Sequence, residues 1–190
     1  ADYVYEIKRL ANPAVNSPIY SLMGDYIQGF IDYAKKLPKN GHVKRYLDLR
    51  LYDLEGVRVI DKYTYEVRLN GEYSQFMYWL AMPFFSPMPW EAIVFYHQAG
   101  MASQNIVLDW YPVGTGPFML LENNPERRMV MVKNPNFREE RYPTDGNELD
   151  QKAGLLKLSG EKLPFLDKIV FNLEKEDLPY WNKFTQGYYD

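Results

Sequence analysis

Residues with the chemistry of catalysis or metal binding are few and scattered in this sequence. The two histidines, His42 and His97, fall in separate predicted elements, and neither has a partner at a metal-site spacing such as His-x-x-x-His. No serine stands in the Gly-x-Ser-x-Gly turn that presents a nucleophile. The sequence has no cysteine, which excludes disulfides and thiolate metal sites. We therefore expect no catalytic residue, no metal site and no cofactor.

Carboxylates gather in two short runs, Glu139-Glu140 and residues 174–177. General acid–base catalysis needs such groups held within reach of a reacting atom. Runs of this kind are typical of solvated faces or of residues near a helix N-terminus, and we interpret them in that way. A hydrolase that uses scattered carboxylates stays an alternative, which a metal- or nucleophile-centred cluster would distinguish.

The sequence YPVGTGPF, at residues 111–118, is the most unusual stretch of the chain. Its motif residues are Pro112, Gly114, Thr115, Gly116 and Pro117. A phosphate-binding loop would continue with Gly-Lys-Ser/Thr, whereas a proline and a phenylalanine follow here. Glycines allow torsions closed to other residues, and the prolines fix the path on either side. We expect a sharp, tightly specified crossing between two sheet regions.

Composition and charge exclude several classes of protein. Of the 190 residues, 46% are hydrophobic and 25% charged, so we expect a packed core. The net charge is −3 and the basic residues are scattered, which argues against nucleic-acid binding. No run approaches the roughly 20 apolar residues of a membrane span, and we expect no signal peptide within these residues. Because the chain begins within a predicted helix, we expect it to be a piece of a longer protein.

The elements that must position any site are helices and hairpins. Apolar spacing predicts a first helix up to Leu10 with Asp2 as its N-cap, and a second over about 21–36. The segment SQFMYWLAM predicts a short buried helix, and WEAIVFYHQAG a helix that Pro89 opens. The segment DLPYWNKFTQGYYD predicts a last helix, with Pro179 in its first turn and a glycine behind it.

Alternating residues predict two hairpins and one more strand. Val57 and Val59 face Tyr65 and its neighbours across a break at Asp61-Lys62. A second hairpin, FMLLENNPERRMVMVKN, turns at Asn-Asn-Pro, and LDKIVFNLE is a strand. The sequence therefore predicts a mixed fold of helices and antiparallel strands.

Several segments together resemble one family. The stretch YPVGTGPF resembles the Pro-Val-Gly-Thr-Gly-Pro-Phe/Tyr signature of the family 5 extracellular solute-binding proteins, the oligopeptide- and dipeptide-binding proteins of bacterial ABC importers. Five further segments resemble family motifs in the same order: ADYVYEIKRLANP with its following Ser-Pro, GVRVIDKYTYEVRL, FFSPMPWEAI, VKNPNFRE, and FLDKIVF with KFTQGYYD. The likeness runs from residue 1 to 190, apart from polar residues 138–163.

The resemblance implies an α+β (mixed α/β) chain that is a fragment of the type II periplasmic-binding-protein fold. It would comprise mostly the extra subdomain of lobe one plus the crossover toward lobe two. Residues 1–137 would be the lobe-one subdomain with helices and two hairpins, 138–163 a polar insertion, and 164–190 a strand and helix leading into the second lobe. Asp190 would stand where the chain enters that lobe.

The resemblance also implies a function. Members bind peptides in a two-lobed cleft and deliver them to ABC permease subunits, in the periplasm or anchored by lipid, without making or breaking a bond. A loop after the first helix approaches the cleft, which corresponds to Ser17, Ile19 and Tyr20. A ligand-contacting tyrosine of one relative falls at Ile19, so that Tyr20 takes its place or the ligand differs. Met82 belongs to a second loop near the cleft in some relatives.

Two alternatives stay open beside peptide import. The family also carries nickel complexes, haem, opines and oligosaccharides, so the solute could be one of these. An interaction domain whose exposed aromatic side chains bind a protein partner is the other alternative. The charged groups that fix peptide termini in the family come mostly from outside these 190 residues, so we expect the chain alone to bind free peptide weakly or not at all.

Overall fold

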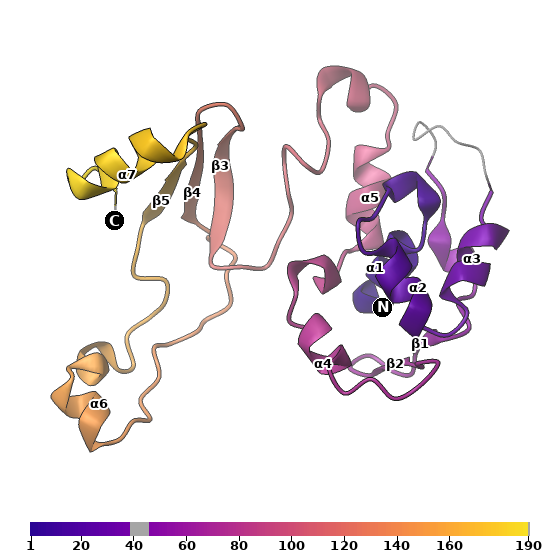
Figure 1. The fold of residues 1–190 in the computed structure, drawn as a ribbon, viewed down its shortest axis with the longest axis horizontal. Helices are drawn as coiled ribbons and strands as arrows, with labels where there is room; N and C mark the ends of the chain where they lie inside the picture. Colours follow the sequence, from indigo (N-terminus) through magenta and orange to yellow (C-terminus); the bar gives the residue numbers. More distant parts are fainter. Residues whose placement is uncertain (39–45, 190) are drawn as a thin grey trace. The chain divides into compact units, whose positions relative to one another are not determined.

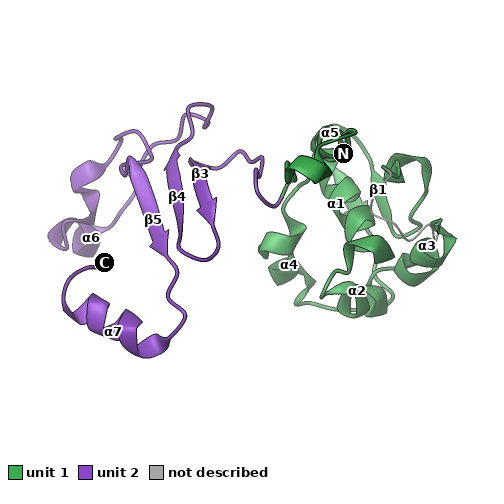
Figure 2. Cartoon of the chain, turned by 90° about the horizontal axis from the view of Figure 1, so that it is seen from above, with its two compact units in different colours: residues 1–108 green, residues 109–190 purple. Residues whose placement is uncertain are grey.

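The computed structural model describes residues 1–38 and 46–189, arranged as a mixture of helices and antiparallel sheets (Figure 1). It divides into two compact units, residues 1–108 and 109–190 (Figure 2). This confirms the mixed α/β fold class. The predicted boundary at 137 does not coincide with the division after residue 108, because the predicted strand LDKIVFNLE pairs with the second hairpin and completes the sheet of the second unit. The assignment of segments to lobes stays a prediction.

Helix α1 (Asp2–Leu10) opens the first unit. Its N-cap position is Ala1, which makes no side-chain cap, and Asp2 lies in the first turn. The predicted cap was therefore wrong by one residue, although a first-turn carboxylate still suits the positive end of the helix dipole. Val4, Ile7 and Leu10 are buried together, as their helical spacing predicts.

The predicted helix over 21–36 is wrong, because the structure has two helices there. Helix α2 (Tyr20–Tyr26) ends where Ile27 turns extended and forms an isolated bridge with Leu69. Helix α3 (Phe30–Lys36) begins after Gly29, whose φ of 70° is left-handed. Ile27 is fully buried and its N–H still donates to the Met23 carbonyl, whereas the next N–H, that of Gln28, donates to the Arg68 carbonyl at 3.0 Å. The helix therefore ends where the backbone begins to pair with a distant extended segment.

The first predicted hairpin is confirmed. Strands β1 (Val57–Val59) and β2 (Tyr65–Val67) pair antiparallel, with Val57 opposite Val67 and Val59 opposite Tyr65. At the predicted break, the Asp61 carboxylate accepts a hydrogen bond of 2.7 Å from the Tyr63 backbone N–H. An aspartate that bonds the backbone two residues on closes the turn.

Two further helices complete the first unit, α4 (Phe76–Trp79) and α5 (Trp90–Tyr96). Proline 89 stands at the N-cap of α5, as predicted. Helix α4 was expected to be buried on most sides, but only Phe76 and Trp79 are buried, while Met77 and Tyr78 face solvent. This one-turn helix buries only one face, so its apolar composition alone predicts more burial than the structure shows.

The second unit is built on one antiparallel sheet in the order β3-β4-β5. Strands β3 (Phe118–Asn124) and β4 (Arg128–Lys133) form the second predicted hairpin, which is confirmed. Strand β5 (Lys168–Asn172) pairs with β4, so the predicted last strand is also confirmed.

Two helices lie in the remainder of this unit. Helix α6 (Glu148–Lys152) belongs to the polar stretch 138–163 and begins at a capping box formed by Asn147 and Asp150. Helix α7 (Asp177–Thr185) is followed by Gly187 with a left-handed φ of 77°. Among the described residues beyond 108, Val130 is the only buried hydrophobic residue, so this unit has little core of its own.

Candidate functional site

The loop that carries Ser17 begins after a 3₁₀ helix (Pro13–Val15) and ends at α2. The Asn12 side chain caps the 3₁₀ helix by accepting from the Ala14 N–H at 3.1 Å. The Ser17 carbonyl accepts from the Tyr20 N–H at 3.1 Å, which holds the loop in a turn. The Ser17 Oγ is buried and has no hydrogen-bond partner among the described residues. A hydroxyl in that state can still donate to or accept from an added group.

Ile19 and Tyr20 are both half-buried and pack against the core of the first unit. The Tyr20 ring lies 5.5 Å from the Phe30 ring, centroid to centroid, in a tilted arrangement. The Ile19 carbonyl accepts from the Met23 N–H at 2.9 Å, in the first turn of α2. The core therefore fixes the position of this part of the loop.

Met82 lies in the segment between α4 and a 3₁₀ helix (Pro83–Phe85). Its backbone N–H donates to the Trp79 carbonyl at 2.9 Å, and 47% of its surface is exposed. In the part of the chain that the structure describes, no hydrogen bond, ion pair or ring contact joins it to the loop at 17–20. The structure thus places Ser17, Ile19, Tyr20 and Met82 in one unit, with the first three at the start of α2 and Met82 in the segment after α4.

The conformation of the glycine motif differs from the expectation. Neither Gly114 nor Gly116 has a left-handed φ, and a Cβ at either position would meet nothing within 4 Å. Pro112 and Thr115 are exposed beside them. The expected need for unusual torsions is therefore wrong: the backbone here adopts a path that other residues could follow.

What anchors the end of the motif is Asn134, which the sequence reasoning did not single out. Its side-chain amide donates to the Gly116 carbonyl at 2.8 Å, and its backbone N–H donates to the Pro117 carbonyl at 2.9 Å. Its Oδ1 accepts from the Asn136 N–H at 3.0 Å. The signal that could have revealed it is the Asn-Pro step after β4, since asparagine there both turns the chain and offers an amide. The two motifs YPVGTGPF and VKNPNFRE thus meet in space.

A cavity of about 360 Å³ lies beside this meeting point. Pro117 and Phe118 line one part of it, and Phe137, Leu163 and Phe165 line others. Its lining also includes Arg138 and Glu140, which form an ion pair of 2.6 Å. The lining is mainly apolar, so the cavity suits an apolar group.

Glu176 stands at the N-cap of α7 and Asp177 in its first turn, as the interpretation of this run predicts. Other residues of the two runs pair with cations. Glu139 pairs with Arg141 at 3.2 Å. Glu174 pairs with Lys183 and accepts from the Tyr189 hydroxyl at 2.6 Å. The hydrogen bond from Lys183 is the main cause that lowers the pKa of Glu174. A carboxylate held ionised in this way is a poor proton donor at neutral pH.

Glu6 is the most perturbed carboxyl group of the first unit. It is only 5% exposed, and its Oε2 has no hydrogen-bond partner among the described residues. Burial raises its pKa to about 7, and the ion pair with Arg9 at 3.2 Å offsets part of that rise. Lys8, also buried, donates to the Tyr52 carbonyl at 2.7 Å. The Glu6–Arg9 pair lies within α1, whereas the Lys8 hydrogen bond ties α1 to another part of the unit.

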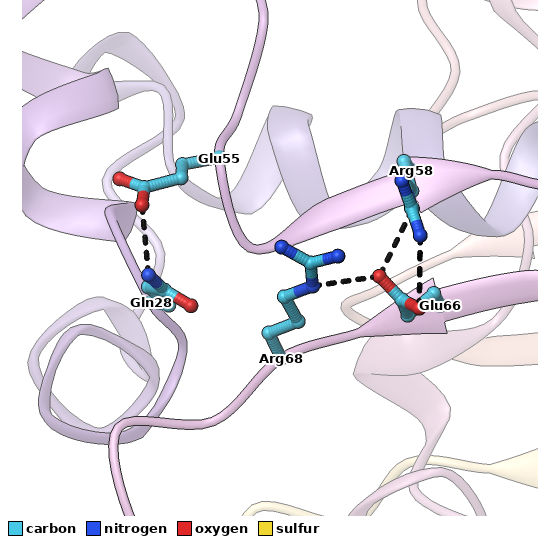
Figure 3. A network of polar contacts seen from close by, with 5 residues as sticks. All are labelled: Gln28, Glu55, Arg58, Glu66 and Arg68. Atoms are coloured by element: carbon cyan, nitrogen blue, oxygen red, sulfur yellow. Dashed lines mark hydrogen bonds and ion pairs between the residues drawn. The ribbon is translucent and has the colours of Figure 1, made fainter.

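Figure 3 shows two separate sets of polar contacts, one at the break between α2 and α3 and one on the β1–β2 hairpin. Gln28 donates to Glu55 at 2.7 Å, and on the hairpin Glu66 pairs with Arg58 at 2.9 Å and Arg68 at 2.8 Å. The hydrogen bond from Arg58 is the main cause that lowers the pKa of Glu66. Backbone hydrogen bonds connect the two sets: the Gln28 N–H donates to the Arg68 carbonyl at 3.0 Å, and the Asn70 N–H donates to the Tyr26 carbonyl at 2.8 Å. The segment that follows β2 thus holds the break between the helices and the end of α2.

The described residues contain no group of three or more metal-ligating acidic or histidine side chains. His97 Nδ1 lies 2.7 Å from the Ile93 carbonyl oxygen, at the end of its own helix. His42 falls outside the described residues. Among the helices that the structure describes, none has the length and apolar character needed to cross a bilayer.

Comparison with solved structures gives the class of the fold. OppA of Burkholderia pseudomallei is similar at 23% identity and a TM-score of 0.63, covering 100% of this chain and 29% of that one. The substrate-binding domain of an oligopeptide ABC transporter from Bacillus anthracis is 20% identical, with a TM-score of 0.61 and the same coverage. Haemophilus influenzae OppA, in complex with the peptide RPPGFSPFR, is 16% identical, with a TM-score of 0.63 and coverage of 100% and 29%. The fold is that of part of a periplasmic binding protein.

The family follows from a family model. The model of the bacterial extracellular solute-binding proteins, family 5 (middle region), matches residues 1–190. The chain therefore belongs to this family, whose members are binding proteins. It spans about 29% of the length of the solved structures that it matches. A search of curated proteins gave no match.

Proposed function

We propose that this chain is part of the substrate-binding component of a bacterial ABC importer that takes up peptides. The observation that carries the proposal is the family match over residues 1–190, together with solved oligopeptide-binding proteins that cover the whole chain. The longer protein binds its peptide in a cleft between two lobes, outside the cytoplasm, and presents it to the permease. Lobe closure is driven by contacts that exist only in the closed, loaded state.

Within this proposal, residues 1–137 belong to lobe one, 138–163 are an insertion, and 164–190 lead toward lobe two. The ligand meets the first unit at Ser17, Ile19 and Tyr20, with Met82 as a further contact. Tyr20 supplies the aromatic contact of this loop. Its position supports this role, because the ring is half-buried and fixed by Phe30, so little freedom is lost on binding.

Calorimetry on the longer protein tests the peptide. We expect tri- or tetrapeptides to bind with a Kd of roughly micromolar strength or tighter, worth about 8 kcal/mol. The 190-residue chain alone should bind the same peptides with a Kd no tighter than about 1 mM. It lacks the second lobe that would close over the peptide. Tight binding of a nickel complex, haem, an opine or an oligosaccharide in place of peptide would overturn the proposed ligand but not the family.

Three substitutions at two tyrosines test the loop. In the longer protein, Tyr20→Ala should weaken peptide binding by about tenfold, equivalent to roughly 1.4 kcal/mol. Tyr20→Phe keeps the ring and shows whether the hydroxyl contributes. The control is Tyr63→Ala, because Tyr63 is exposed at the tip of the β1–β2 hairpin. Equal affinities for the parent and Tyr20→Ala would contradict the role of this loop.

A further inference from the structure

The Asn70-Gly71 step just after β2 joins two exposed residues that lie outside the helices and strands. A Cβ added at Gly71 would meet nothing within 4 Å, so the space beside its backbone is open. Among the residues that the structure describes, the Gly71 N–H donates to no backbone carbonyl. Glycine also has no side chain that would shield its own nitrogen. The Gly71 nitrogen is therefore free to react with the side chain that precedes it.

The Asn70 amide groups hold the end of α2. The backbone N–H donates to the Tyr26 carbonyl at 2.8 Å, and the side-chain Nδ2 donates to the Asp25 carbonyl at 3.2 Å. Both carbonyls belong to the last turn of α2, which contains no basic side chain. Carbonyls at this end of a helix lack intrahelical donors and carry its negative partial charge. A donor amide suits this position, whereas a carboxylate would be repelled from it.

We propose that Asn70 is a site of spontaneous covalent modification, in which water converts its side-chain amide into a carboxylate. The Gly71 nitrogen loses its proton to hydroxide and attacks the Asn70 Cγ. The new C–N bond closes a succinimide ring, and Nδ2 takes a proton from water and leaves as ammonia. Water then opens the ring. Cleavage of the bond from nitrogen to Cγ gives aspartate, and cleavage of the bond from nitrogen to the backbone carbonyl carbon gives isoaspartate. Water is the only co-reactant, and no group is oxidised or reduced.

Both products weaken the contact with α2. Each replaces the Nδ2 donor by a carboxylate, so that one acceptor faces another at the Asp25 carbonyl. Isoaspartate also lengthens the backbone between Asn70 and Gly71 by a methylene group. The same break between the helices is held by the hydrogen bond from the Gln28 N–H to the Arg68 carbonyl. The modification therefore loosens the end of α2 from the segment that follows β2, whichever solute the protein carries.

Peptide mapping by mass spectrometry tests the reaction on the longer protein, aged at mildly alkaline pH. Base speeds the first step, because the attacking nitrogen must lose its proton. The peptide that contains Asn70 should gain the mass difference between OH and NH2, as a mixture of isoaspartate and aspartate. The internal control is Asn134, because Pro135 has no N–H with which to attack. An unchanged Asn70, aspartate without isoaspartate, or equal modification at Asn134 would overturn the proposal.

The variant Gly71→Ala keeps the asparagine and hinders the attacking nitrogen. The added methyl group has room, so the fold is retained. It should slow the modification of Asn70 by roughly tenfold, equal to about 1.4 kcal/mol in the activation free energy. The chain has one other Asn-Gly step, Asn40-Gly41, whose rate should stay the same in this variant. An equal rate at Asn70 in the parent and the variant would contradict attack by this nitrogen.

The variant Asn70→Asp tests the consequence separately from the reaction. Hydrogen exchange of the amides of residue 70 and Gln28 should become faster by about fivefold, which corresponds to roughly 1 kcal/mol. The Ile60 amide is the control, because it donates to the Thr64 carbonyl at 3.0 Å at the other end of the hairpin. Exchange at residue 70 and Gln28 equal to that of the parent would contradict the loosening of α2. None of these measurements uses a peptide ligand, so their failure is distinct from a failure of the proposed function.

Discussion

Substituting Gly56 by alanine should strongly destabilise the first unit. A Cβ at this position would lie 2.4 Å from the Gln28 carbonyl oxygen and 3.1 Å from the Arg68 carbonyl oxygen. Both neighbours are backbone atoms, so neither can rotate away. The three residues also form a ring of backbone hydrogen bonds: Gly56 to Gln28 at 3.1 Å, Gln28 to Arg68 at 3.0 Å, and Arg68 to Gly56 at 2.7 Å. The methyl group can be accommodated only if these segments separate.

The expected loss follows from two effects. Overpacking of a close contact costs about 1–3 kcal/mol. The separation also weakens up to three hydrogen bonds, each worth about 0.5–1.5 kcal/mol net. We therefore expect Gly56→Ala to lower the free energy of unfolding by about 3–5 kcal/mol, a large fraction of the stability of an ordinary domain.

Urea unfolding of the 190-residue chain measures this loss. Fluorescence reports on the first unit through Trp79, which is buried in its core. The matched control is Gly71→Ala, because a Cβ there meets nothing within 4 Å and φ is not left-handed. The control should change stability by less than about 0.5 kcal/mol. A Gly56→Ala variant within about 1 kcal/mol of the parent would refute the argument that three backbones meet at this glycine.

Three other substitutions test the glycine motif and the buried carboxyl group of Glu6. Gly116→Val should leave the Tm unchanged, because its site is open, whereas Asn134→Ala should cost about 1–3 kcal/mol by leaving the Gly116 carbonyl without its donor; the reverse order, measured by thermal unfolding, would restore the torsional explanation of the motif. Burial raises the pKa of Glu6 to about 7, so the protonated form is favoured in the folded state. Its contribution to stability is present below the unfolded pKa and is lost as pH rises through 7, by about 3 kcal/mol in total. Glu6→Gln should remove this fall between urea titrations at pH 5 and pH 8, and parallel pH profiles for the variant and the parent would contradict it.

The hairpins could be predicted because their signals are local. Alternating side chains define the faces of β1 and β2, and an aspartate or an Asn-Pro step closes each turn within a few residues. The break between α2 and α3 could not be predicted in this way. Ile27 fits the helical stripe, and what overrides it is pairing with Leu69, a residue far along the chain. Tertiary contacts of this kind are absent from a periodicity argument.

The candidate site was predictable only in outline. Its position in a loop before α2 follows from the prolines and from the family motif, but the fixing of Tyr20 by Phe30 depends on packing. For the glycine motif, the sequence predicted unusual backbone torsions that the structure does not have. Glycine permits unusual torsions without requiring them, and the contacts that hold Gly116 come through its carbonyl and Asn134. The glycines and prolines indicated that residues 111–118 have a structural role, whereas only the fold shows that Asn134 is their hydrogen-bond partner.

We propose that the longer protein binds a peptide and releases it unchanged. The most direct measurement is mass spectrometry of a tetrapeptide recovered after incubation with the purified longer protein at equal concentrations. We expect the peptide to co-elute with the protein and to be recovered intact. A peptide that fails to co-elute, or that returns cleaved, would contradict the account.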